Sequence, residues 1–206
     1  MNEEIKTGTT TVGLIAKDSV VLAADMRASM GHLASDEEAK KIYNITDNIA
    51  MTNAGSVGDS LALIRYLRSH AKLYEVERET KITVKATAVF LSNILNSNRF
   101  YPFLVQFIVG GVNNKPELYE LDLSGGVLDR KKYAVSGSGT ELALSVLDQQ
   151  YKEGITKEEA IKLAIAAVNA AKKRDIYSGG VSVTVMVITK QGIHELNEEE
   201  IKSYSN

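Results

Sequence analysis

Apolar residues recur with two different periods along the chain, and the period identifies the expected elements. Short or alternating apolar runs bounded by turn residues predict β-strands. Lys17-Asp18 and Asp47-Asn48 are turn residues of this kind, and each joins two strand-like segments into a predicted hairpin. The predicted strands cover residues 9–16, 19–24, 41–44, 49–53, 103–110, 118–123, 132–135, 181–189 and 192–195.

Four longer segments show the helical period instead. In the first of them, Leu61, Ile64 and Leu67 fall on one stripe, as an amphipathic helix requires. Thr156 followed by Glu159 is the signature of a capping box, which marks the start of the last of these helices. The predicted helices cover residues 58–77, 85–96, 140–151 and 157–173, and a short polar helix follows the last strand.

The order of these elements is strands, two helices, strands, two helices and strands. It lacks the strand–helix–strand alternation of parallel sheets, so it predicts an α+β fold with antiparallel sheets and helices outside them. Two sheets packed face to face between two helix layers satisfy this order. No linker rich in Pro, Gly or Ser divides the 206 residues, so we expect a single domain.

Composition narrows the class of protein. A formal net charge of −2 argues against a general binder of nucleic acids or anionic membranes. The absence of cysteine excludes disulfides and thiolate metal sites, and it fits a reducing cytoplasm. The first residues are acidic and lack an apolar core, unlike a secretory signal. His32, His70 and His194 show no metal-ligand spacing, so we expect them to be ordinary surface or core residues; the family resemblance described below implies no metal or organic cofactor.

Thr9 is the candidate nucleophile. It begins a strand-like run directly after Gly8, behind an acidic leader of residues 1–8. Cleavage between Gly8 and Thr9 would leave a free α-amine beside the Thr9 hydroxyl, and such an amine has a pKa of about 7.7–8.0. One residue would then supply the nucleophile and its general base. Taken alone, a Thr triplet is more simply explained as a frayed terminus followed by an edge strand.

Two charged residues at strand ends are candidates for an ion pair. Asp25 ends an apolar strand, where a buried carboxylate is costly unless it is paired. Lys41 begins another strand, and Lys40 beside it would point to the opposite face. The pattern alone favours two ordinary surface charges over a buried pair.

Two glycine-containing turns add further candidates. Gly55 lies between a strand and a helix, where a free backbone N–H suits an oxyanion hole, and a plain turn is an equally good interpretation. Residues 136–139 (SGSG) follow a strand, but they match neither dinucleotide nor P-loop motifs, so a structural turn is favoured. No GxSxG nucleophile elbow is present in the chain.

Taken together and in order, these segments resemble an archaeal-type 20S proteasome β subunit, a threonine protease of the N-terminal nucleophile hydrolase superfamily. Each motif alone is weak, but the series and its spacing are specific, and the resemblance covers the whole chain after the leader. The motifs lie at residues 9–13 (TTTVG), 20–29 (VVLAADMRAS), 39–42 (AKKI), 54–59 (AGSVGD), 136–139 (SGSG) and 173–180 (KRDIYSGG).

The resemblance implies a four-layer αββα sandwich, with residues 1–8 as a propeptide that the chain removes itself and residues 9–206 as one domain. It implies that Thr9 is the nucleophile, that Lys41 lowers the pKa of the Thr9 hydroxyl and amine, and that Asp25 orients Lys41. It assigns the oxyanion donor to the backbone N–H of Gly55. The residues expected to hold the N-terminal amine are Ser138, Asp175 and Ser178.

The same resemblance implies a substrate pocket with two departures from the family pattern. Ala28, Ser29, Asn53 and Val57 would shape the pocket together with Lys41. Asn53 stands where an apolar residue is common, which puts a simple preference for large apolar side chains in doubt. Ser29 stands where a threonine is common, and we expect little effect because its substrate contacts would be made by the backbone.

The function implied is a cytoplasmic endopeptidase that degrades unfolded polypeptides inside a ring-shaped chamber, activated by cleavage between Gly8 and Thr9. The implied partners are other β subunits in a seven-membered ring, proteasome α subunits and a regulatory unfoldase ATPase. A non-catalytic structural β subunit of a mixed ring and an unprocessed assembly intermediate are the alternatives. A shorter bacterial-type two-ring peptidase of the same superfamily is disfavoured by the pattern at residues 54–59.

Overall fold

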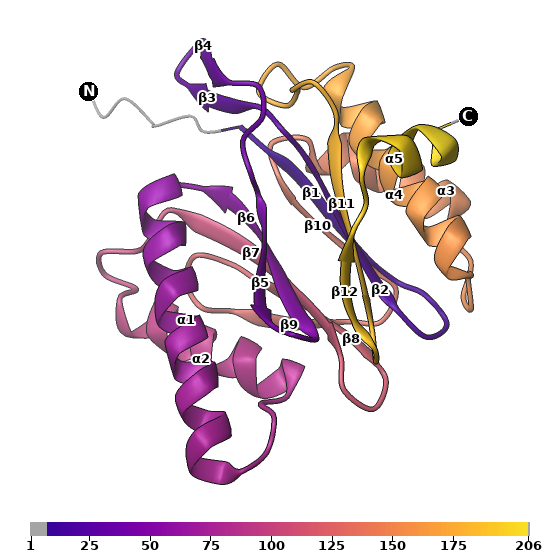
Figure 1. Ribbon diagram of the computed structural model, residues 1–206. Coiled ribbons are helices and arrows are strands. Elements are labelled where there is room, and N and C mark those ends of the chain that lie inside the picture. The colour runs from indigo at the N-terminus through magenta and orange to yellow at the C-terminus, as the bar shows by residue number, and fades with distance from the viewer. Residues whose placement is uncertain (1–7, 206) are drawn as a thin grey trace.

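Two antiparallel sheets lie face to face between two layers of helices in the computed structural model, which describes residues 8–205 (Figure 1). The first sheet has the strand order β10–β1–β2–β11–β12. Its outer face is covered by helices α3 (Thr140–Gln150), α4 (Lys157–Lys172) and α5 (Glu198–Tyr204). The strands of this sheet are β1 (Thr10–Ile15), β2 (Val20–Asp25), β10 (Tyr133–Gly137), β11 (Val183–Thr189) and β12 (Gly192–Glu195).

The second sheet has the strand order β5–β6–β7–β8–β9, and helices α1 and α2 cover its outer face (Figure 1). Each strand pairs with the next strand along the chain, so the sheet is a meander. The two helices form the connection between β6 and β7. The strands of this sheet are β5 (Ile42–Thr46), β6 (Ile49–Gly55), β7 (Val105–Val112), β8 (Pro116–Leu121) and β9 (Val127–Arg130).

Local sequence signals set the helix ends. At the start of the fourth helix the Thr156 hydroxyl accepts from the Glu159 N–H, and the Glu159 carboxylate accepts from the Thr156 N–H, so the predicted capping box is confirmed. Ser56 and Thr83 cap the first two helices in the simpler way. The helices are α1 (Val57–Arg78), α2 (Val84–Ser97), α3 (Thr140–Gln150), α4 (Lys157–Lys172) and α5 (Glu198–Tyr204).

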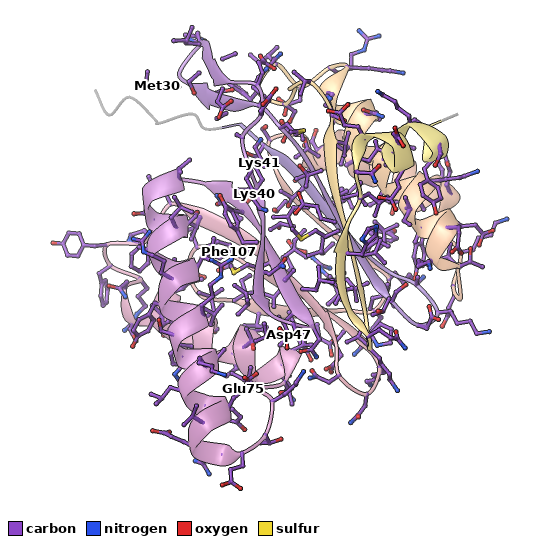
Figure 2. The ribbon with its side chains drawn as sticks, viewed as in Figure 1. Met30, Lys40, Lys41, Asp47, Glu75 and Phe107 are labelled. Atoms are coloured by element: carbon purple, nitrogen blue, oxygen red, sulfur yellow. The ribbon has the colours of Figure 1, made fainter. Side chains whose placement is uncertain are left out.

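Three separate apolar cores fill the three spaces between the four layers. Strand β2 shows how one segment serves two of them, because successive side chains of a strand point to opposite faces. Val21 and Ala23 pack toward α3 and α4, whereas Val20 and Leu22 pack toward the other sheet. Phe107 of β7 belongs to the third core, under α1 and α2 (Figure 2). The predicted α+β class and four-layer arrangement are therefore confirmed.

Each predicted strand and helix is present within two residues of its expected ends. Three strands were not predicted: β9 and the hairpin of β3 (Ala28–Met30) and β4 (Leu33–Asp36), which forms a separate two-stranded sheet. The hairpin projects beyond the sandwich at the end where β1 begins (Figure 1). Within residues 8–205, no helix combines the length and the hydropathy needed to cross a membrane.

Candidate active site

The candidate residues Thr9, Asp25 and Lys41 come from neighbouring strand ends. Thr9 directly precedes β1, Asp25 is the last residue of β2, and Lys41 directly precedes β5. Antiparallel pairing places the start of β1 beside the end of β2. Figure 2 shows Lys41 between the two sheets, at the end of the molecule that carries the β3–β4 hairpin.

Asp25 and Lys41 form a buried ion pair. The Lys41 ammonium lies 2.6 Å from Asp25 Oδ1, and the two side chains are 6% and 0% exposed, respectively. The same oxygen accepts from the Thr10 N–H at 2.9 Å, and Oδ2 accepts from the Gly179 N–H at 2.8 Å and the Arg27 N–H at 3.2 Å. The interpretation as two surface charges, which the pattern alone favoured, is wrong because the sandwich closes over both residues.

The two adjacent lysines have opposite environments. Burial lowers the pKa of Lys41 below its ordinary value, and the neighbouring Asp25 carboxylate opposes that shift. Lys40 is exposed and pairs with Glu195 at 3.3 Å. The chain therefore presents one lysine to the interior and the other to the surface, as expected at the start of a strand.

Thr9 is buried, and its backbone N–H joins a hydrogen-bonded network. The N–H donates to Ser138 Oγ at 3.1 Å, and the Ser138 hydroxyl donates to Asp175 Oδ2 at 2.5 Å. Ser178 donates to the same carboxylate oxygen at 2.6 Å. The structure thus joins Ser138, Asp175 and Ser178 in one network, in which Ser138 contacts the Thr9 nitrogen, although the three residues lie on two distant segments of the chain.

Thr10 is a member of this network that sequence reasoning missed. Its hydroxyl lies 2.6 Å from Ser178 Oγ and is fully buried. A Cβ at position 139 would lie 2.0 Å from Thr10 Oγ1, so Gly139 is needed for this close approach. The signal was present as the Thr triplet, but the triplet alone does not say which hydroxyl faces which partner.

The Thr9 hydroxyl points back at the preceding residue. It donates to the Gly8 carbonyl oxygen at 2.5 Å. Within residues 8–205, Lys41 makes no direct hydrogen bond to Thr9; the Asp25 carboxylate connects the two by accepting from Lys41 and from the N–H of the next residue, Thr10.

Gly55 is the last residue of β6, a strand that contacts β1 of the other sheet. A hydrogen bond of 3.0 Å between the Thr11 and Thr52 hydroxyls joins these two strands. Gly55 has φ +120°, and a Cβ there would lie 2.1 Å from the Leu104 carbonyl oxygen. Only glycine fits this position, whichever role its N–H has.

The four expected pocket residues lie on three elements. Ala28 and Ser29 belong to β3, and the Ser29 hydroxyl donates to the Tyr177 carbonyl at 3.3 Å. Val57 is the first residue of α1 and is largely exposed. Asn53 is buried, and its side-chain oxygen accepts from the Ser60 hydroxyl, so part of its polar group is already satisfied inside the protein.

The three histidines are dispersed. His32 lies in the turn of the β3–β4 hairpin, His70 stacks on Phe90, and His194 contacts Glu200 at 2.8 Å. Over the described residues 8–205, no group of three or more His, Cys, Asp or Glu side chains is arranged to hold a metal ion.

Comparison with known proteins gives a consistent result. The family model for the proteasome subunit matches residues 5–188. The chain is 47% identical to proteasome subunit beta 1 of Thermococcus kodakarensis over 203 residues, which cover 98% of each chain. It is 50% identical to proteasome subunit beta of Methanocaldococcus vulcanius over 196 residues, covering 94% of this chain and 87% of that protein. With a buried acid–lysine pair beside a threonine at the head of β1, and with full-length similarity to archaeal β subunits, the chain belongs to the proteasome subunit family.

Proposed function

We propose that this chain is a catalytic β subunit of a 20S proteasome core particle, acting as an N-terminal threonine endopeptidase. The observation that carries the proposal is the position of the Thr9 hydroxyl, which donates a hydrogen bond to the Gly8 carbonyl oxygen. The N–H of the next residue, Thr10, donates to Asp25 of the buried Asp25–Lys41 pair. Membership of the family implies assembly with other subunits into a proteasome particle. We further propose that its partners are other β subunits in a seven-membered ring, α subunits in adjoining rings and an unfoldase ATPase, and that the particle works in the cytoplasm.

The first reaction is removal of the leader. Thr9 Oγ forms a bond to the Gly8 carbonyl carbon, the Gly8–Thr9 C–N bond breaks, and the nitrogen takes the hydroxyl proton. The resulting ester is hydrolysed by water, which leaves a carboxylate on Gly8 and a free α-amine on Thr9. Only glycine fits directly before the cut in this conformation, because a Cβ at position 8 would lie 1.6 Å from Tyr177 Cβ.

The second reaction is peptide hydrolysis. The new α-amine accepts the Thr9 hydroxyl proton, Oγ attacks a substrate carbonyl, and water then releases the acyl group. Ser138 and Asp175 hold the nitrogen in place, and the Lys41 ammonium lowers the pKa of the amine. The Gly55 N–H stabilises the oxyanion. These steps use protein groups and water alone.

The two alternatives to this proposal are a non-catalytic structural β subunit of a mixed ring and an unprocessed assembly intermediate. The intact set of Thr9, Asp25 and Lys41 favours the catalytic subunit, because a purely structural subunit has no use for a buried pair that is costly to maintain.

Intact mass tests the proposal on protein assembled with α subunits. We expect the wild-type chain to lose residues 1–8 and to hydrolyse fluorogenic peptides. The Thr9→Ala variant should keep the leader and show no peptidase activity. Clean removal of the leader from Thr9→Ala would point to an external protease, and a wild-type ring that keeps its leader and stays inactive would favour the structural alternative.

A further inference from the structure

Lys172 differs from the two basic residues that follow it. Cations at a helix C-terminus are ordinarily solvated and interact with the helix dipole, which describes the exposed Lys173 and Arg174. Lys172 is partly buried in the last turn of α4. Its ammonium donates to the Gly180 carbonyl at 3.0 Å and to the Ser182 carbonyl at 2.8 Å.

These two carbonyls belong to the segment that holds the Asp25 carboxylate. Gly179, next to Gly180, donates its N–H to Asp25 Oδ2 at 2.8 Å and accepts from the Met26 N–H at 3.0 Å. Gly180 has φ +93°, a conformation that other residues rarely adopt. Without an external anchor, this segment has few side chains of its own to fix its path.

The segment is also crowded on the side of Arg27. A Cβ at position 179 would lie 2.4 Å from Arg27 Cζ, so the guanidinium packs directly on the Gly179 backbone. Arg27 in turn pairs with Glu37 at 3.1 Å, and the Glu37 carbonyl accepts from the Val181 N–H. Residues 179–182 are therefore held between Arg27 and Glu37 on one side and Lys172 on the other.

The charges around Lys172 are consistent with an electrostatic link to the site. Burial lowers the pKa of Lys172; the negative charges of Asp25 and Glu37 oppose this shift, and the positive charge of Arg27 adds to it. Lys172 thus contributes positive charge near the same carboxylate that holds Lys41.

We propose that Lys172 is a positioning residue for the Asp25–Lys41 pair, acting by holding residues 179–182 so that the Gly179 N–H stays on Asp25. The inference rests on the proposed function. Lys172 touches no reacting atom; it acts through the loop and through Asp25. The sequence could not distinguish it from Lys173, because only the packing of α4 on the sheet decides which lysine faces inward.

The test compares Lys172→Met, Lys172→Gln and Lys172→Arg with Lys173→Met as the matched control, each assembled with α subunits and freed of its leader. For Lys172→Met we expect kcat to fall about tenfold with KM little changed, since a small displacement of a catalytic group is enough for such a loss. The acidic limb of the kcat/KM profile should move to higher pH, because a displaced Asp25–Lys41 pair lowers the pKa of the Thr9 amine less than the wild-type pair does.

Lys172→Arg keeps the charge and the donors, so it should restore most of kcat and the wild-type pH profile, and Lys173→Met should match the wild type. If Lys172→Met fails to assemble, Lys172→Gln takes its place, because it keeps one donor but not the charge and should still shift the acidic limb. An unshifted limb in either neutral variant, or a loss that Lys172→Arg does not restore, would overturn the proposal. Thr9→Ala measured in parallel tests the proposed function separately from the role of Lys172, because an active Thr9→Ala ring would contradict the proposed function.

Discussion

At the scale of single residues, the Asp25 carboxylate decides where the other groups of the site lie. Three backbone N–H groups and the Lys41 ammonium surround it, and it has no exposed surface. Removing one partner of a buried pair leaves an uncompensated charge and typically costs about 3–5 kcal/mol of stability. Removal of either partner alone is therefore expected to weaken the fold as well as the proposed chemistry.

Replacing Lys41 by Met should therefore reduce peptidase activity sharply. Loss of an electrostatic stabiliser at a reacting centre lowers the rate by about 10²–10³. Peptide hydrolysis by the assembled variant is the measurement, with intact mass to report whether the leader is removed. Lys40→Met is the matched control and should be mild, because Lys40 is exposed. Near wild-type turnover by a processed Lys41→Met ring would exclude the proposed role of Lys41.

The pH dependence of the wild type follows from the same residue. Lys41 carries its positive charge only below its pKa, and burial lowers that pKa from 10.5. Activity that depends on the ammonium is present below the lowered pKa and is lost as the pH rises through it. We expect the alkaline limb of kcat/KM below pH 10.5. Lys41→Arg, whose side chain stays charged, should show no such limb in its residual activity; a wild-type rate that is constant up to that pH would contradict the assignment.

At the scale of elements, local signals account for most of the fold. Hydrophobic period and turn residues were enough to predict nine of the ten strands of the two large sheets and the helices, because each of those elements buries a face in one of the three cores. The hairpin β3–β4 was missed since its residues are exposed or only partly buried and so carry no apolar alternation. Strand β9 was missed for the same reason, with Leu128 exposed.

The candidate site was less accessible from the sequence. Motif resemblance named Ser138 and Asp175, but their contact depends on how the end of β10 approaches the segment after α4, which no local pattern encodes. The roles of Thr10, Gly179 and Lys172 depend on the same long-range packing. Local sequence patterns do not show how distant segments pack against one another, and it is this packing that buries Asp25.

The capping box of α4 offers a test at this scale. Thr156→Ala removes the side-chain acceptor for the Glu159 N–H, and such a change costs about 1 kcal/mol. Urea unfolding of the chain should show this loss, and Thr156→Ser should restore most of it. Ser69→Ala is the control, because the Ser69 hydroxyl is exposed and bonds only within α1. An equal loss in both alanine variants would mean that the cap contributes nothing specific.

At the scale of the whole molecule, several large apolar side chains remain at the surface. Phe100 and Tyr101 lie in the connection after α2, and Ile176 and Val181 lie in the connection after α4. Solitary apolar residues on a surface are ordinary, whereas contiguous exposed apolar surface is typical of contacts with other proteins. This distribution agrees with a subunit that works inside a larger particle.

Co-expression with α subunits should accordingly yield a particle far larger than the 22.5 kDa of the single chain. Multi-angle light scattering gives the mass, and peptide hydrolysis is measured on the same fractions. Expression without α subunits is the control and should leave the leader in place if assembly completes the site. A monomer with full peptidase activity in the presence of α subunits would contradict the enclosed chamber.

The pairing of β1 with β10 has a consequence for timing. Thr9 and Ser138 are separated by 129 positions along the chain, yet they meet directly in the folded protein. Contacts between such distant segments form slowly during folding, after most local structure. A nascent or half-folded chain therefore has Thr9 but not the hydrogen-bonded network that surrounds it in the folded protein. Under the proposed function, removal of the leader can begin only after this long-range contact has formed, so the chain would stay inactive as a protease while it folds, without any separate inhibitor.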